Sequence, residues 1–98
     1  MPKGYIYAEF EVTDAVEWEK YVPLAQASLA EFGARYVVRG GNPEVLEGQP
    51  PVDRRLSILE FENRERAAEW YRSPQYQAAK AVRQRAATVN VTLLSGPE

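Results

Sequence analysis

Hydrophobic and polar residues alternate along four short segments of the chain, which is the pattern of β-strands with two unlike faces. In the first segment, residues 4–12, the apolar residues Ile6 and Phe10 alternate with Tyr7 and Glu9. The same alternation predicts further strands at residues 34–39, 55–62 and 89–95. Each strand is therefore expected to turn one face toward a core.

Between these strands, apolar residues recur at the spacing of α-helices. Asp14 is the expected N-cap of a first helix that ends at Gly33, and Pro23 inside it is expected to kink or interrupt the helix. Asn63 is the expected cap of a short second helix. The pair Ser73-Pro74 stops that helix and starts another, because proline is favoured in the first turn.

The element order β-α-β-β-α-β predicts one α+β domain over residues 1–98 with a ferredoxin-like antiparallel sheet. Residues 44–48 are expected to continue the second strand as a hairpin arm. In such a sheet the strands lie in the order fourth, first, third, second. The helices cover one face, which is expected to carry Ile6, Phe10, Val38, Leu59 and Phe61.

The opposite, open face is expected to carry Tyr7, Glu9, Val37, Arg39, Leu56, Ile58 and Glu60. Such a face is too apolar and aromatic to lie bare in water. A chain of 98 residues also builds only a modest core. We therefore expect a homodimer that forms through the open face, with a small-molecule pocket on the same face.

A polar cluster is predicted within that pocket. Glu9, Glu60 and Arg39 come from neighbouring strands, and Tyr7 lies one pleat from Glu9. Two carboxylates close together in an apolar site would have one raised pKa, which suits a general acid or base. Arg39 would then bind a substrate carboxylate or enolate, and Tyr7 would orient the substrate. The alternative is that Arg39 only neutralises the two glutamates, or that all three pair across a dimer interface.

The run from Trp70 to Tyr76 carries three aromatic residues. Trp70 is interpreted as a core residue at a helix junction, whereas the phenols of Tyr71 and Tyr76 need polar partners if they are buried. Arg83, two turns beyond Tyr76, is a candidate for the same cavity edge or for a surface ion pair. Tyr7, Tyr71, Tyr76 and Arg83 are therefore the candidate substrate-binding residues, beside the candidate catalytic residues Glu60, Arg39 and Glu9.

The composition limits the kinds of catalysis and metal binding that are possible, because the chain contains neither cysteine nor histidine. The absence of cysteine excludes disulfides and thiolate catalysis. The absence of histidine excludes the residue that most often acts as a general base or a metal ligand. Acid–base chemistry must then use Asp, Glu, Tyr or Lys, or a bound compound. The acidic pairs Glu9/Glu11 and Glu60/Glu62 lie along strands without loop oxygens, so no metal site is predicted.

The net charge of the chain limits the classes of binding partner. The net charge is −2, so the basic field of a nucleic-acid or membrane-surface protein is missing. The sequence shows neither a signal peptide nor an apolar run long enough to span a bilayer, which indicates a cytoplasmic protein.

Taken together, these motifs resemble a known family. Gly4-Tyr5, Asp14, Tyr21, Arg39-Gly40-Gly41, Glu47-Gly48, Glu60-Phe61, Ala68-x-Trp70-Tyr71-x-Ser73-Pro74-x-Tyr76 and Arg83 are similar to the pattern of the domain-of-unknown-function 1330 family. The resemblance covers nearly the whole chain. It implies a ferredoxin-like subunit of a dimeric α/β barrel, near small dimeric monooxygenases and isomerases that often work without metal or flavin.

Two functions follow as hypotheses. The first is a cofactor-free enzyme, of monooxygenase or isomerase type, that acts on a small aromatic or carbonyl compound. The second is a homodimer that binds a small ligand without converting it, or that has a purely structural role.

Overall fold

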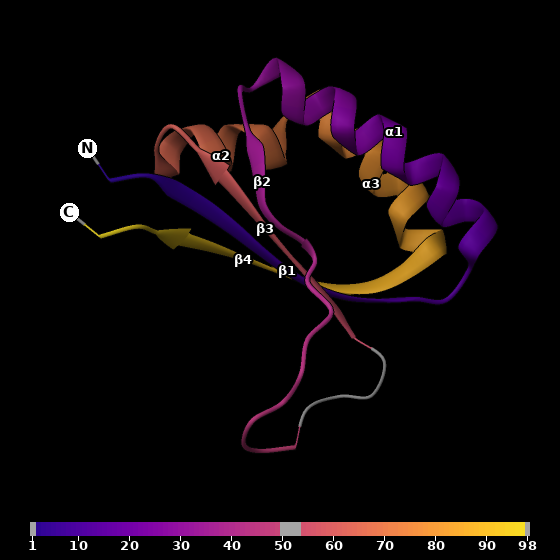
Figure 1. Cartoon of the computed structure of the whole chain (residues 1–98). Coiled ribbons are helices and arrows are strands. Elements are labelled where there is room, and N and C mark those ends of the chain that lie inside the picture. The colour runs from indigo at the N-terminus through magenta and orange to yellow at the C-terminus, as the bar shows by residue number, and fades with distance from the viewer. Residues whose placement is uncertain (1, 50–53, 98) are drawn as a thin grey trace.

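The computed structural model describes residues 2–49 and 54–97 and contains a four-stranded antiparallel sheet with three helices (Figure 1). The elements follow one another as β1 (Gly4–Val12), α1 (Ala15–Glu31), β2 (Arg35–Gly40), β3 (Arg55–Phe61), α2 (Arg64–Arg72), α3 (Pro74–Ala86) and β4 (Ala87–Ser95). The predicted strands and helices are therefore confirmed, with small differences at their ends.

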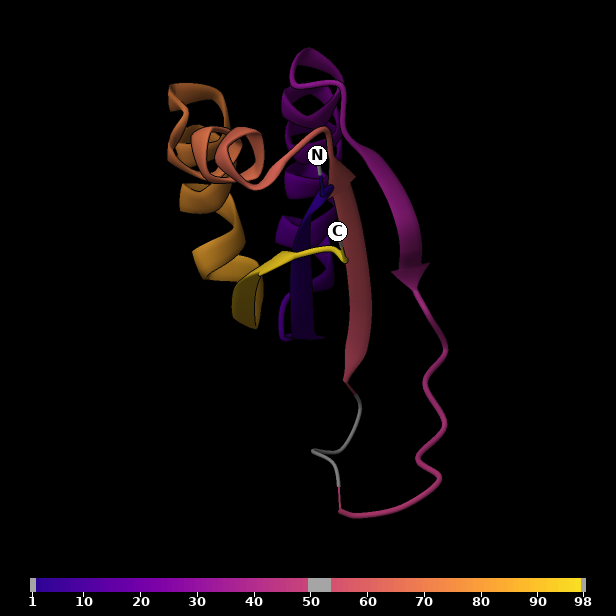
Figure 2. The ribbon, with the colours of Figure 1, turned by 90° about the vertical axis from the view of Figure 1, so that its left-hand side faces the viewer.

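The strands lie in the order β2-β3-β1-β4, which is the predicted ferredoxin-like order. Both edges of β1 are paired antiparallel, with Gly4 opposite Phe61 of β3 and Ser95 of β4. Helices α1 and α3 pack side by side, and α2 lies near the end of the sheet where β1 begins (Figures 1 and 2). Among the described residues, all helices lie on one face of the sheet, and the other face carries none (Figures 1 and 2).

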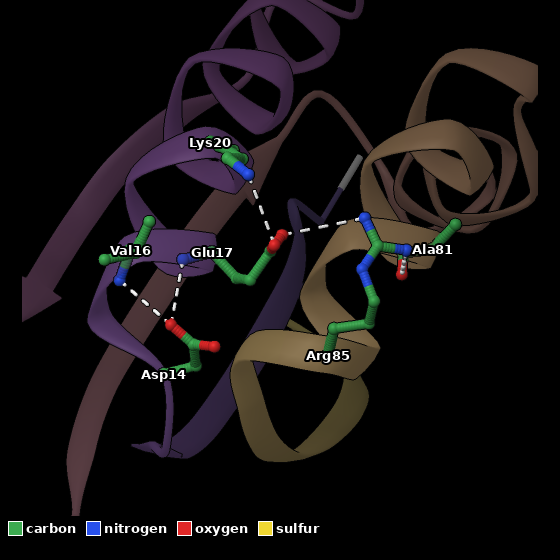
Figure 3. Close-up of polar contacts among 6 residues, drawn as sticks. All are labelled: Asp14, Val16, Glu17, Lys20, Ala81 and Arg85. Carbon is green, nitrogen blue, oxygen red and sulfur yellow. Dashed lines mark hydrogen bonds and ion pairs between the residues drawn. The ribbon is translucent and has the colours of Figure 1, made fainter.

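Each helix begins with a side-chain cap, and the caps at Asp14 and Asn63 are the predicted ones. Asp14 Oδ1 accepts hydrogen bonds from the backbone N–H groups of Val16 at 3.1 Å and Glu17 at 3.2 Å (Figure 3). Asn63 accepts from the Arg66 N–H in α2, and Ser73 accepts from the Tyr76 N–H in α3. Each cap satisfies a backbone donor that the helix leaves free.

Glu17 connects the first helix to the third. Its carboxylate lies 3.2 Å from Lys20 Nζ on α1 and 3.6 Å from Arg85 Nη2 on α3 (Figure 3). The ion pair with Arg85 thus joins the start of α1 to the end of α3. The neighbouring backbone adds to this contact, because the Thr13 and Asp14 N–H groups donate to the Ala86 carbonyl.

Two local expectations were wrong or only partly right. Helix α1 continues through Pro23 from Ala15 to Glu31, so the proline does not interrupt it. Residues 44–48 form no strand, and the described part of the β2–β3 connection extends away from the sheet and helices (Figures 1 and 2). Gly40, Gly41 and Asn42 have φ values of 78°, 68° and 40°, and this left-handed backbone ends the strand pairing.

The core lies between the sheet and the helices, as expected. Ile6, Leu59 and Phe61 of the sheet pack against buried residues of all three helices, including Leu29, Ala67, Trp70, Tyr76 and Ala79. Trp70 is 2% exposed, and its Nε1–H donates to Ser28 Oγ at 3.0 Å. The interpretation of Trp70 as a core residue is therefore confirmed.

A β-bulge in β2 changes which face its residues occupy. Tyr36 is opposite Leu59 and Val38 is opposite Ile58, so Val37 is an extra residue between them. Beyond the bulge the alternation is inverted: Val38 shares the open face with Ile58, and Arg39, opposite Ser57, faces the helices. The predicted faces of Val38 and Arg39 were therefore wrong, because the prediction assumed a regular strand.

Gly4 is expected to tolerate no larger side chain. A Cβ atom at Gly4 would overlap the backbone carbonyl of Asn63, which caps α2. We expect Gly4→Ala to lower the free energy of unfolding by about 1–3 kcal/mol, measured by urea denaturation. Glu11→Ala on the exposed end of the same strand is the control. Equal stability of both variants would contradict this close packing.

Candidate functional site

The helix-side cavity lies between the helices and the sheet, whereas the predicted pocket was on the open face. It has a volume of about 380 Å³, within the range of small-ligand sites. Strands β1, β2, β3 and β4 form its floor and α1, α2 and α3 contribute to its walls, with Ile6, Phe10, Trp18, Tyr21, Leu59, Trp70 and Val91 among the apolar and aromatic lining residues. A ligand here would be surrounded largely by apolar surface.

A short hydrogen-bonded chain of polar groups lines this apolar cavity. Arg83 Nη1 donates to the phenol oxygen of Tyr76 at 2.8 Å, and the phenol oxygens of Tyr76 and Tyr21 lie 3.0 Å apart. Arg83 and Tyr76 come from α3 and Tyr21 from α1, so the packing of these two helices brings the three groups together. All three line the cavity.

The guanidinium of Arg83 is buried, and no carboxylate of the described residues forms an ion pair with it. Arg83 is only 8% exposed, and the ion pairs found among the described residues do not include it. A buried charge without a counter-ion costs several kcal/mol, because it loses hydration that phenol oxygens replace only in part. An anionic or strongly polarised ligand oxygen would offset that cost.

The surroundings hold the phenols of Tyr21 and Tyr36 in their neutral form. Burial, followed by the nearby phenol of Tyr76, raises the pKa of Tyr21 far above its usual value of 10.0. Burial also raises the pKa of Tyr36, although the Arg39 cation opposes this. Neutral phenols keep their hydrogen, so these side chains are available as hydrogen-bond donors.

Arg39 lies at the boundary of the cavity and is held there by neighbouring groups. With its amide oxygen turned toward Arg39, Gln26 of α1 accepts from Nη1 at 3.1 Å and from Nη2 at 2.7 Å. The guanidinium carbon lies 5.1 Å from the centre of the Tyr36 ring, within cation–π range. Of the predicted site residues, the structure thus places Arg39, Tyr76 and Arg83 in one cavity.

The predicted cluster of Glu9, Glu60 and Arg39 was wrong. Both glutamates are on the open face, but Glu60 is opposite Tyr5 and Glu9 is opposite Leu56. The two positions are four residues apart along the strands, which corresponds to about 13 Å. Arg39 is on the other face because of the bulge.

Each glutamate has its own partners on the open face. Glu60 accepts from Arg35 Nε at 2.9 Å and from the Tyr5 hydroxyl at 3.0 Å. The hydrogen bond from Arg35 lowers the pKa of Glu60, which keeps it ionised.

Glu9 forms the equivalent contacts at the other end of the face. It accepts from Arg54 Nη1 at 2.8 Å and from the Tyr7 hydroxyl at 3.3 Å. Tyr7 is therefore beside Glu9, as predicted, but neither residue lines the helix-side cavity.

Tyr71 is next to the hydrogen-bonded chain rather than in the cavity. Its ring centre is 5.5 Å from that of Tyr76, and Tyr71 lines a separate recess of about 200 Å³ with Ala68 and Arg72. Burial acts to raise the pKa of Tyr71, but the adjacent cations Lys80 and Arg83 outweigh it, so the pKa lies below 10.0.

From the sequence, Tyr36 and Arg55 were not selected as site residues, and Tyr21 was part of the family pattern without a role in the site. All three line the cavity. Alternation within residues 34–39 places Tyr36 on the helix-covered face, so a signal for Tyr36 was present. The alternation within residues 55–62 likewise places Arg55 on the face of Leu59 and Phe61, so a signal for Arg55 was present as well.

Comparison with known proteins identifies the family. The model of the family described as Domain of unknown function (DUF1330) matches residues 3–97. The chain belongs to this family. No curated protein matches the chain in a sequence search. The DUF1330 assignment confirms the resemblance seen in the sequence.

Several solved structures share the fold of this DUF1330 chain. A protein of unknown function from Rhodopseudomonas palustris superposes with a TM-score of 0.78 and 17% identity, over 99% of this chain and 84% of the other. SnoaB, a cofactor-independent oxygenase from Streptomyces nogalater, has a TM-score of 0.67 and 13% identity, over 100% and 96%. A dimeric protein of ferredoxin-like fold from Bacteroides fragilis has a TM-score of 0.51 and 12% identity, over 95% of both chains. Identities this low show the fold alone.

Residues 2–49 and 54–97 contain neither a carboxylate cluster suited to a metal ion nor a helix suited to span a membrane. No group of three or more Asp or Glu side chains in that part of the chain could hold a metal ion. None of its helices is both long and apolar enough to cross a membrane.

We expect Tyr71 to ionise before Tyr5, Tyr7, Tyr21 and Tyr36 as the pH rises, because adjacent cations lower the pKa of Tyr71, whereas the pKa values of these four are raised. The measurement is the ultraviolet absorbance of tyrosinate during an alkaline titration. Tyr71→Phe should remove the earliest phase, and Lys80→Met should move it to higher pH because a stabilising cation is lost. If the early phase persisted in Tyr71→Phe, it would come from another tyrosine and the prediction for Tyr71 would be wrong.

Proposed function

We propose that the helix-side cavity binds a small aromatic or carbonyl compound and stabilises the anion that forms on its oxygen. The observation that carries this proposal is the buried Arg83 guanidinium, hydrogen-bonded to Tyr76 in a cavity with largely apolar walls. A cation and phenol donors in a site of low dielectric favour an enolate or phenolate oxygen over its neutral form. The aromatic walls suit a planar ring system.

The proposed reaction is that of a cofactor-free enzyme. None of the described residues that line the cavity carries a carboxylate, so the substrate's proton would pass to water or through the phenols of Tyr76 and Tyr21. In the monooxygenase form, an activated CH₂ group reacts with O₂: one oxygen atom becomes the new carbonyl, and the other leaves as water with the two hydrogens. In the isomerase form, the same enolate is reprotonated at another carbon.

Glu9 and Glu60, the first candidates for the proton transfer, are given a different role here. Their ion pairs with Arg54 and Arg35 neutralise these two carboxylates on the open face of the sheet. Tyr7 and Tyr5 take part in the same hydrogen bonds. Such pairs suit a surface that is covered in an assembly, because buried carboxylates must be matched by cations.

We expect the protein to accelerate hydrogen–deuterium exchange at C1 of 2-tetralone, a ketone whose C1 hydrogens become acidic when its oxygen is stabilised. Proton NMR in D₂O measures this exchange, and an oxygen electrode distinguishes monooxygenase from isomerase chemistry. Tyr76→Phe should reduce the exchange rate about tenfold or more, because it removes a hydrogen-bonding group at the oxygen. Tyr7→Phe, on the open face, should leave the rate unchanged.

A pair of variants tests whether the exchange takes place in the cavity. Val22 lines the cavity, whereas Leu24 on the same helix is 44% exposed and does not line it. Val22→Trp should therefore block the exchange and Leu24→Trp should not. If Tyr7→Phe abolished the exchange and Val22→Trp had no effect, the site would be on the open face and the proposal would be wrong. Binding of 2-tetralone without exchange would favour the non-catalytic alternative.

We also propose that the protein forms a homodimer through the open face of the sheet. This face carries Tyr5, Tyr7, Leu56, Ile58 and Leu94, and the helices leave it uncovered. Leu94 is 42% exposed and Val37 in the adjacent bulge is 47% exposed. Burial of this apolar surface against a second copy would add stability to a chain with a modest core.

Sedimentation velocity is expected to give the mass of a dimer at micromolar concentration. Ile58→Arg should convert the protein to a monomer, because it places an unpaired charge in the centre of the face. Leu24→Arg, on the helix side, should leave the dimer intact. A monomeric unmodified protein would contradict the proposed interface.

A further inference from the structure

The mouth of the cavity opens beside a second, polar groove. Arg39 of β2 and Arg55 of β3 line both the 380 Å³ cavity and this groove, whose volume is about 1000 Å³. Gly41, Asn42 and Pro43, in the connection that follows β2, also line the groove. An extended ligand could therefore occupy the cavity and pass between the two arginines into the groove.

The bulge in β2 is what brings the two arginines together. Arg39 is opposite Ser57, and Arg55 is two residues before Ser57 on the same face of β3. Side chains at such diagonal positions lie within reach of one ligand group when they are long. In a regular strand, Arg39 would point to the open face and the mouth would hold Arg55 alone.

The charge at this mouth is locally positive, although the whole chain carries −2. Within the described part of the chain, neither Arg39 nor Arg55 takes part in an ion pair. Arg54 also lines the groove, but the carboxylate of Glu9, 2.8 Å away, offsets its charge. Among the described residues that line the groove, Glu11 is the one that carries a carboxylate. Arg39 and Arg55 therefore supply the charge that an anion would meet.

Arg39 is also positioned to bind an anion with little loss of freedom. Gln26 takes two of its N–H groups, and the Tyr36 ring lies beside the guanidinium. A guanidinium has five N–H donors, so the others remain for a ligand. A planar, fixed guanidinium matches the two oxygens of a carboxylate.

We infer that the ligand of this protein is amphiphilic: an aromatic part with a polarised oxygen occupies the cavity, and a carboxylate at its opposite end binds Arg39 and Arg55. This inference rests on the proposed function, because it requires the aromatic part to enter the cavity. It adds a substrate class, namely aromatic or carbonyl compounds that carry a carboxylate arm. It also adds Arg55 as a specificity residue.

Two matched probes test the inference. 2-Naphthol has the ring and the hydroxyl, and 6-hydroxy-2-naphthoic acid has in addition a carboxylate at the far end of the ring system. We expect the acid to bind the protein about tenfold more tightly than the naphthol in isothermal titration calorimetry. The ratio of the two affinities should fall as salt is added, because the arginines are exposed to solvent.

The variants separate this recognition from a general charge effect. Arg55→Ala and Arg39→Ala should each reduce the preference for the acid about threefold, and the double variant should remove it while still binding the naphthol. Arg64→Ala is the control: it removes one positive charge from an exposed residue of α2 that lines neither space. All three positions are at the surface or the mouth, so the fold should be retained in all four variants.

The outcomes distinguish the two proposals. If the naphthol binds and the acid binds no better, or if the preference survives in the double variant, the inference about the carboxylate is overturned and the proposed function stands. If neither probe binds, the proposed function fails and the inference fails with it. A preference that is lost equally in Arg64→Ala would reflect net charge alone and would also overturn the inference.

Discussion

The burial of the Arg83 guanidinium is the constraint around which the helix side of this protein is organised. Arg83 is 8% exposed and forms no ion pair within the described part of the chain. Its charge must therefore be stabilised by neighbouring dipoles. Tyr76 provides one at 2.8 Å, and Tyr21 extends the arrangement from the facing helix. The packing of α1 on α3 therefore decides both the shape of the cavity and its electrostatic character.

The two faces of the sheet differ in how their charges are balanced. On the open face, two carboxylates are matched by arginines of the same chain, Glu60 by Arg35 and Glu9 by Arg54. On the helix face, the cations Arg83 and Arg39 lie next to phenols and an amide. Neutralised charge suits an interface, whereas cations without carboxylates suit an anionic ligand. This contrast is the physical basis for placing the ligand under the helices and the partner subunit on the open face.

Local signals in the sequence were sufficient for most of the fold. Asp14, Asn63 and Ser73-Pro74 mark helix starts through side-chain capping and fixed backbone angles, and all three caps form. Period-two alternation located the strands because one face is buried. The strand order followed from the order of the elements, and the structure has it.

The candidate site was less accessible from the sequence, for a physical reason. A single extra residue, Val37, inverts the alternation of β2, and nothing in the residues themselves distinguishes a bulged strand from a regular one. Arg39 was therefore assigned to the wrong face, and the predicted cluster with Glu9 and Glu60 does not exist. Tyr76 and Arg83, by contrast, are separated by two helical turns, and that spacing placed them correctly on one side of α3.

The most direct test of this account is an NMR titration of the isotope-labelled protein with 2-naphthol, in which the side-chain N–H signals of the arginines and the backbone amides are followed together. If the ligand is bound beneath the helices, the side-chain signal of Arg83 and the amides of Tyr76 and Tyr21 shift in step with binding, while Arg35 is unaffected. If Arg83 stays unchanged and the amides of Tyr7, Glu9 and Ile58 shift instead, the ligand is on the open face and the account is wrong.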